Sequence, residues 1–203
     1  MLRIMTLIGT PMDSLCGKLL IAMPSMPDPR FAHSVVLLCA HTAEGAMGVI
    51  INKPLPDLTL VKLLRHLDLP MAGATVGLGD APRDMAVHFG GPVETSRGFV
   101  LHSPDLVIED GSVHVAGGIV LSTSVEILVE MARGQGPAQV IAALGYAGWG
   151  PGQLEDEIQA GGWLLADASR ALLFETDDSL KWSATLAGMG VDPRLLSGAT
   201  GHA

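Results

Sequence analysis

The sequence predicts an α+β fold built on a mixed or mainly antiparallel sheet, and three observations carry this prediction. Segments with strand character and segments with helical periodicity follow one another without the strict β–α–β alternation of a parallel sheet. No internal repeat, low-complexity tract or clear linker interrupts the chain. A length of 203 residues suits one domain and allows a core that needs no metal or disulfide. We therefore expect residues 1–203 to form a single domain.

The first half of the chain begins with three predicted strands, at residues 17–23, 34–41 and 47–52. The last two are rich in aliphatic side chains and flank a short turn, which predicts a hairpin. The third strand should end at Lys53, because a residue before proline is pushed into an extended conformation and Pro54 cannot donate a ladder hydrogen bond.

A helix should follow, with Thr59 as its N-cap. Four leucines then repeat at the spacing of one helical face: Leu60, Leu63, Leu64 and Leu67. Residues 70–85 have the glycines and proline of a long connection. Two short strands are expected beyond it, at residues 87–89 and 98–102.

A second hairpin is predicted around Asp110-Gly111, which is a typical type I′ turn between residues 107–108 and 113–115. Thr123 to Glu126 form a capping-box pattern that opens a helix ending near residues 133–134. The run 140–144 has the pattern of either a buried strand or a short helix.

Pro151 predicts the first turn of another helix, which ends at Gly161-Gly162 before a strand at residues 163–166. The last predicted helix spans residues 178–187.

Composition excludes several classes of protein. The longest apolar run, residues 35–40, is far shorter than the ~20 residues of a membrane-spanning helix. We expect a cytoplasmic protein in which Cys16 and Cys39 are buried small hydrophobic residues. A net charge of −9, with no two basic residues adjacent, disfavours direct binding to DNA or RNA.

The most informative segment runs from Gly145 to Glu157. Four glycines, a proline and a tryptophan fall within its first eight residues, and three acidic residues follow. A strand, a glycine-rich loop and a helix can cradle a phosphate, but the acids already occupy the positive end of the helix dipole. The favoured interpretation is a structural turn, and the alternatives are a pocket wall containing Trp149 and Gln153 or a role for Glu155 or Glu157 in cation binding or catalysis.

Other candidate residues lie at predicted strand ends. His88, Gly90 and Gly91 belong to a sharp turn that is similar to the oxyanion loop of α/β-hydrolases, although the chain has no G-x-S-x-G nucleophile elbow. Asn52 and Lys53 place an amide and a cation where ligand sites are common.

If the strands concerned are neighbours, residues 24–26, 52–54 and the glycine segment border one cleft. The predicted ligand-binding set is Asn52, Lys53, His88, Gly90, Gly91, Trp149, Gln153 and Glu157. Cys39 and His41 share a strand face, but a metal site would need more ligands, and we predict neither a metal nor a cofactor.

Several sequence blocks together resemble the AlgH/YqgE family of bacterial proteins. They are residues 19–24, 34–37, 45–48, 52–54, 90–93, 98–102, 145–157 and the tail around Lys181-Trp182 and residues 188–193. The resemblance spans nearly the whole chain. It implies one AlgH-like α+β domain with a bent or split sheet forming a small barrel surrounded by helices. It also implies a role described as transcriptional regulation, and it supplies no catalytic residues.

Three functions compete at this point. The first is a non-enzymatic binding or regulatory protein that engages a small ligand or a protein partner through the cleft. The second is an enzyme that uses Glu155 or Glu157 with His88 or Lys53. The third, direct DNA binding, is opposed by the charge pattern.

Overall fold

The architecture consists of two curled halves of one mainly antiparallel sheet that share a long central strand, and only β5 and β9 pair in parallel among the described strands. The computed structural model describes residues 14–67 and 85–196. The strands in these ranges are β1 (Lys18–Ala22), β2 (Val35–Thr42), β3 (Gly45–Ile50), β4 (Pro54–Thr59), β5 (Ala86–Phe89), β6 (Val93–His102), β7 (Ser112–Val115), β8 (Ile119–Ser122), β9 (Val140–Trp149) and β10 (Trp163–Asp167). The helices are α1 (Leu60–His66), α2 (Val125–Ala132), α3 (Gln153–Gln159), the π-helical turn η2 (Ala171–Glu175), α4 (Asp178–Gly188) and α5 (Pro193–Leu196).

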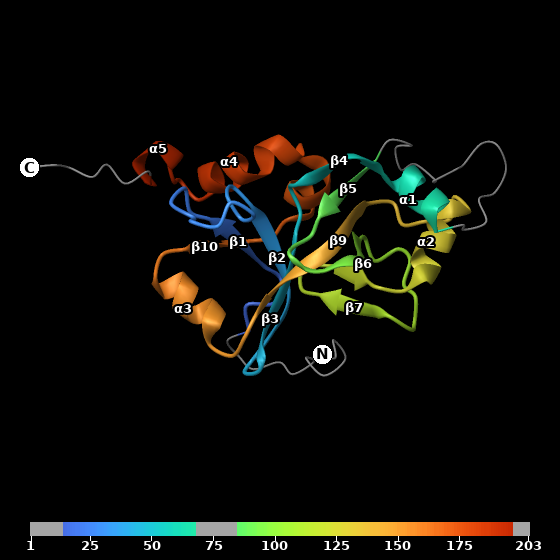
Figure 1. The fold of residues 1–203 in the computed structure, drawn as a ribbon, viewed down its shortest axis with the longest axis horizontal. Coiled ribbons are helices and arrows are strands. Elements are labelled where there is room, and N and C mark those ends of the chain that lie inside the picture. The colour runs from blue at the N-terminus through green and yellow to red at the C-terminus, as the bar shows by residue number, and fades with distance from the viewer. Residues whose placement is uncertain (1–13, 68–84, 197–203) are drawn as a thin grey trace, which may run out of the picture.

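The strand β9 joins the two halves. Its end, at residues 147–149, pairs with β3 in the half ordered β10-β1-β2-β3-β9. Its beginning, at residues 140–144, pairs with β5 and β6 in the other half, where β8 and β7 follow β6. In Figure 1, β9 runs diagonally through the centre, with β1, β10 and α3 on one side and β6, β7, α1 and α2 on the other. The bent, barrel-like sheet implied by the family resemblance is therefore present as a curled half-barrel.

The helices cover separate parts of the sheet and close three apolar clusters. Leu173 of η2 and Leu186 of α4 complete the largest cluster, which extends across both halves of the sheet. Leu154 of α3 completes a second cluster, on the opposite face of the first half. The third lies beneath α1 and α2 in the second half. Burial of these faces gives most of the stabilisation, at about 25 cal/mol per Å² of apolar surface.

Glycines in the central strand β9 and in the connection from β5 to β6 allow these two segments of the chain to cross. The connection from β5 to β6 passes from one side of β9 to the other through Gly90 and Gly91. A Cβ on Gly91 would lie 2.1 Å from the carbonyl carbon of Tyr146, and one on Gly90 would lie 2.2 Å from the carbonyl oxygen of Gly145. Gly145 itself has φ +75°. Only residues without a Cβ allow the two backbones to approach this closely.

Three sequence-based predictions about this region and the second hairpin are wrong. The glycine segment is part of a strand, because β9 continues through Gly145 to Trp149. Pro151 precedes α3, whose N-cap is Gly152 with φ +72°. The second hairpin joins β7 to β8 and turns at Gly117-Gly118, both with positive φ, so Asp110-Gly111 lies before the hairpin.

Most other elements are confirmed. The hairpin of β2 and β3 forms, and Thr59 caps α1 by accepting a hydrogen bond from the Lys62 amide. Ser124, one residue later than predicted, caps α2. The run 140–144 is a strand, as one of the two open interpretations required. The strands β4 and β8 and the elements η2 and α5 were missed, and the strand predicted at 107–108 does not form. The connection predicted at 70–85 lies almost wholly outside the described residues.

Candidate functional site

A groove of about 590 Å³ opens where the two outer strands of the first sheet half, β9 and β10, approach each other. Its walls are the loop after β1, the end of β9, the helix α3 and the start of β10. The lining residues are Ser25, Met26, Pro27, Asp28, Arg30, Phe31, Pro92, Gly148, Trp149, Gln153, Glu157, Ala160, Gly161, Gly162 and Trp163. Three residues of the predicted site, Trp149, Gln153 and Glu157, are therefore brought together here.

The carboxylate of Glu157 holds two tryptophans in place. Its Oε2 accepts a hydrogen bond of 2.9 Å from Trp149 Nε1 and one of 2.8 Å from Trp163 Nε1. The two rings are edge-to-face, with centroids 6.0 Å apart. Since both indoles are buried, each needs an acceptor for its N–H, and one carboxylate oxygen serves both.

The spacing along α3 explains why sequence reasoning found part of this cluster. Gln153 and Glu157 are one helical turn apart and therefore lie on the same face of the helix. The Gln153 side chain donates from Nε2 to Glu157 Oε1 at 2.9 Å and accepts from the Gly150 amide at 3.0 Å. The corner between β9 and α3 is thereby closed by side chains that also line the groove.

The loop after β1 supplies the opposite wall. Phe31 packs edge-to-face on Trp163 with a centroid distance of 5.6 Å. Arg30 and Asp28 form a two-point ion pair, with Arg30 Nη2 2.7 Å from Asp28 Oδ2 and Arg30 Nε 3.0 Å from Asp28 Oδ1. Hydrogen bonding to Arg30 lowers the pKa of Asp28. The rim therefore carries one positive and one negative charge that compensate each other.

Asn52 and Lys53 support this loop from behind and do not line the groove. Asn52 accepts from the Val35 amide at 2.8 Å and donates to the His33 carbonyl at 2.9 Å. Lys53 Nζ donates to the Arg30 carbonyl at 2.8 Å, and burial lowers the pKa of Lys53. Both residues line a separate hollow of about 280 Å³ next to the start of α4. The loop thus divides the single cleft that the sequence suggested.

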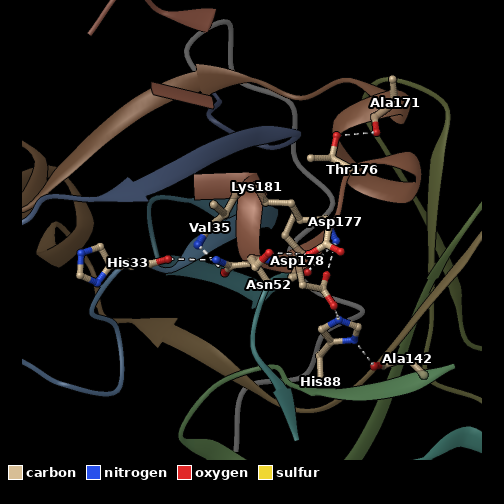
Figure 2. Close-up of polar contacts among 12 residues, drawn as sticks. His33, Val35, Asn52, His88, Ala142, Ala171, Thr176, Asp177, Asp178 and Lys181 are labelled. Atoms are coloured by element: carbon tan, nitrogen blue, oxygen red, sulfur yellow. Dashed lines mark hydrogen bonds and ion pairs between the residues drawn. The ribbon is translucent and has the colours of Figure 1, made fainter. Parts of the chain in front are cut away.

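His88 lies in a buried polar network, which Figure 2 shows. It is not among the residues that line the groove. Its Nε2 is 2.9 Å from Asp178 Oδ2, and its Nδ1 is 3.2 Å from the Ala142 carbonyl oxygen. Both neighbours are acceptors, so an imidazole makes both hydrogen bonds only when both ring nitrogens carry a hydrogen. Lys181, also buried, donates to Asp178 Oδ1 at 2.6 Å and to the Ile51 carbonyl at 3.0 Å. The network fixes α4 on the sheet.

The charge of Asp178 is stabilised by this network. Burial alone would raise the pKa of Asp178, but hydrogen bonds from His88 and Lys181 lower it to about 2.

Of the remaining predicted residues, Gly90 and Gly91 are buried against β9, and only the following Pro92 reaches the groove.

Glu155 lies outside the groove and pairs with His41. His41 Nε2 is 2.6 Å from Glu155 Oε1, and His41 Nδ1 accepts from the Leu15 amide. A backbone hydrogen bond and, to a smaller extent, the hydrogen bond with His41 lower the pKa of Glu155. Over residues 14–67 and 85–196, no three His, Cys, Asp or Glu residues are grouped to hold a metal ion. No helix in these ranges has the length and apolar character of a membrane span.

Sequence reasoning missed Trp163, Phe31 and Arg30 as groove residues. Trp163 was recognised only as the start of a strand, and nothing local relates it to Trp149. The two meet because the first sheet half curls until β10 approaches the end of β9. An indole N–H at the start of a buried strand needs an acceptor, and that was the one available signal.

Comparison with known proteins gives consistent results over nearly the whole chain. A family model described as AlgH-like matches residues 19–194. A UPF0301 protein of Cereibacter sphaeroides is 51% identical over 189 residues, covering 93% of this chain and 99% of the relative. A UPF0301 protein of Bradyrhizobium diazoefficiens is 49% identical, covering 92% of this chain and 87% of the relative.

Solved structures support the same fold. The chain is similar to the solution structure of the AlgH protein from Pseudomonas aeruginosa, with a TM-score of 0.74 and 38% identity over 96% of this chain and 99% of that one. A crystal structure of a Corynebacterium diphtheriae protein gives a TM-score of 0.69 at 24% identity, over 94% and 93% of the two chains, and supports the fold alone. The sequence and its fold together show that this chain belongs to the AlgH-like, UPF0301 family.

Proposed function

We propose that this protein is a non-enzymatic binding or regulatory protein that holds a small ligand in the groove between β9, β10 and α3. The observation that carries the proposal is the pair Trp149 and Trp163, which Glu157 fixes at the wall of a groove of about 590 Å³. Pockets for small molecules commonly have volumes of about 300–1,000 Å³, apolar and aromatic linings and a few placed polar groups.

The lining is preorganised for binding. Glu157 and Gln153 bond to each other and to neighbouring groups, so the walls keep their positions before a ligand arrives. Gly148, Gly161 and Gly162 leave bare backbone along the groove, which permits close approach of a ligand. Less conformational freedom is then lost on binding, which favours affinity.

An enzyme using an acid with a histidine is less well supported. Glu157 contacts two indoles and an amide, whereas His88 contacts Asp178 and the Ala142 carbonyl. Glu155 pairs with His41, away from the groove. Neither acid therefore has the histidine partner that the hypothesis assigned to it, and direct nucleic-acid binding is still opposed by the net charge of −9.

A thermal-shift screen tests the proposal. A ligand that binds only the folded state raises the melting temperature in a concentration-dependent way. The groove-filling variant Ala160→Trp should abolish the shift produced by a hit, because Ala160 lines the groove. The matched control Gln159→Trp adds the same side chain one residue away, at an exposed position outside the lining. A ligand that raises the melting temperature of Ala160→Trp as much as that of the unmodified protein would contradict groove binding. A broad library in which no compound raises the melting temperature would also contradict it.

A further inference from the structure

The charge balance inside the groove identifies the chemical class of ligand. Three charged residues line it: Asp28, Arg30 and Glu157. Asp28 and Arg30 neutralise each other in an ion pair on the loop. Among the described residues, Glu157 forms no ion pair, and the side chains that bond to it are those of Trp149, Trp163 and Gln153, all neutral. The lining therefore carries one carboxylate charge that no cation of residues 14–67 or 85–196 pairs with.

The hydrogen bonds of Glu157 leave capacity on one oxygen. Oε2 receives both indole donors, whereas Oε1 receives only the Gln153 amide. A carboxylate oxygen accepts about two hydrogen bonds, so Oε1 can take one more donor. Hydrogen bonds between a cation and a carboxylate are stronger than neutral ones.

The aromatic lining favours the same ligand charge. Trp149, Trp163 and Phe31 all border the groove, and Met26 adds a polarisable thioether. The face of an aromatic ring attracts a cation through its quadrupole, and tryptophan does so most strongly. Aromatic rings beside an uncompensated carboxylate form a lining that suits ammonium groups and repels anions.

We propose that the groove binds a cationic small molecule, a primary amine or a quaternary ammonium compound, whose positive charge lies beside Oε1 of Glu157 in the groove that Trp149, Trp163 and Phe31 line. This inference rests on the proposed binding function and specifies its ligand class. The loop after β1 supplies Phe31 and the neutral ion pair at the rim, so the carboxylate inside sets the charge preference.

Tryptophan fluorescence can test the inference with probes matched in shape. Choline is compared with neohexyl alcohol, in which carbon replaces the charged nitrogen, and benzylamine is compared with benzyl alcohol. At least one cation should bind about tenfold more tightly than its neutral partner, because Oε1 of Glu157 accepts a charge-assisted hydrogen bond from a primary ammonium and attracts a quaternary ammonium by its charge alone. A set of anionic and neutral metabolites is titrated in parallel.

The variant Glu157→Gln removes the charge and keeps an oxygen that can accept from the indoles. It should reduce the cation-to-neutral ratio to about one, whereas Glu155→Gln, on the same helix but outside the groove, should leave the ratio unchanged. Equal binding of cation and neutral partner, or a preference that survives in Glu157→Gln, would overturn the inference. If only anionic or neutral compounds bind, and Ala160→Trp abolishes their binding, the cation inference is refuted and groove binding still stands. Absence of binding by every probe would refute both. If Glu157→Gln does not fold, the ratio in the unmodified protein decides.

Discussion

Removal of the Asp178 charge should destabilise the protein by an amount that depends on pH. Asp178 is bonded to two buried side chains, His88 and Lys181, and 27% of its own side chain is exposed. The variant Asp178→Asn leaves these groups without their carboxylate partner. Breaking a buried ion pair costs about 3–5 kcal/mol, and the partial exposure of Asp178 favours the lower end.

The pH dependence follows from the pKa of the carboxyl group. Its pKa is about 2 in the folded protein, against an ordinary value of 3.8. A lowered pKa stabilises the folded state above the unfolded value, and this contribution is lost as the pH falls toward the folded value. It amounts to about 2 kcal/mol near pH 5 and about 1 kcal/mol near pH 3. The difference in free energy of unfolding between Asp178→Asn and the unmodified protein should therefore narrow by about 1 kcal/mol over that interval.

Urea unfolding at several pH values measures this directly. Asp177→Asn is the matched control, because it removes a neighbouring carboxylate and retains an N-cap oxygen for the Ser179 amide. This control should change the free energy of unfolding by less than about 1 kcal/mol. A difference for Asp178→Asn that stays constant between about pH 5 and about pH 3 would refute the assigned role of the network.

Two further predictions concern the strand crossing and the thiols. The variant Gly91→Ala should lose more than about 4 kcal/mol of stability or fail to fold, since its Cβ would lie 2.1 Å from a backbone atom of Tyr146. Gly98→Ala, where a Cβ meets nothing within 4 Å, should change the free energy of unfolding by less than about 1 kcal/mol; equal losses would contradict the crossing argument. Burial raises the pKa of both cysteine thiols and places that of Cys39 far above its usual range, so Cys39 should react with a thiol reagent only after unfolding, more slowly than Cys16. Rapid labelling of Cys39 in the native protein would contradict this.

Local sequence signals predicted the elements whose determinants are local. The hairpin of β2 and β3, the cap at Thr59 and the helix α4 depend on neighbouring residues, and all three are confirmed. The chain turns at Asp110-Gly111, but the hairpin predicted there was wrong, because Gly117-Gly118 supplies an equally strong turn signal and lies between the paired strands β7 and β8. A high local content of glycine could not distinguish a loop from a strand that another segment of the same chain crosses, since both need residues without a Cβ.

The candidate site was likewise predictable only where its residues are close in sequence. Trp149, Gln153 and Glu157 are close in sequence, and helical spacing brings the last two together. Trp163 and Phe31 reach the groove through the curl of the sheet, which no local pattern encodes. His88 and Asn52 were included because they lie at strand ends, but their partners come from distant elements and direct them away from the groove.

The most direct measurement of the central claim is a two-dimensional NMR titration of the tryptophan side-chain N–H signals. The chain has three tryptophans. Two of them donate to Glu157 in the groove, and Trp182 donates to the Ala22 carbonyl elsewhere. A ligand found by the screen should shift the signals of Trp149 and Trp163 and leave that of Trp182 in place. A ligand that shifts Trp182 alone, or none of the three, would contradict the assignment of the groove as the binding site.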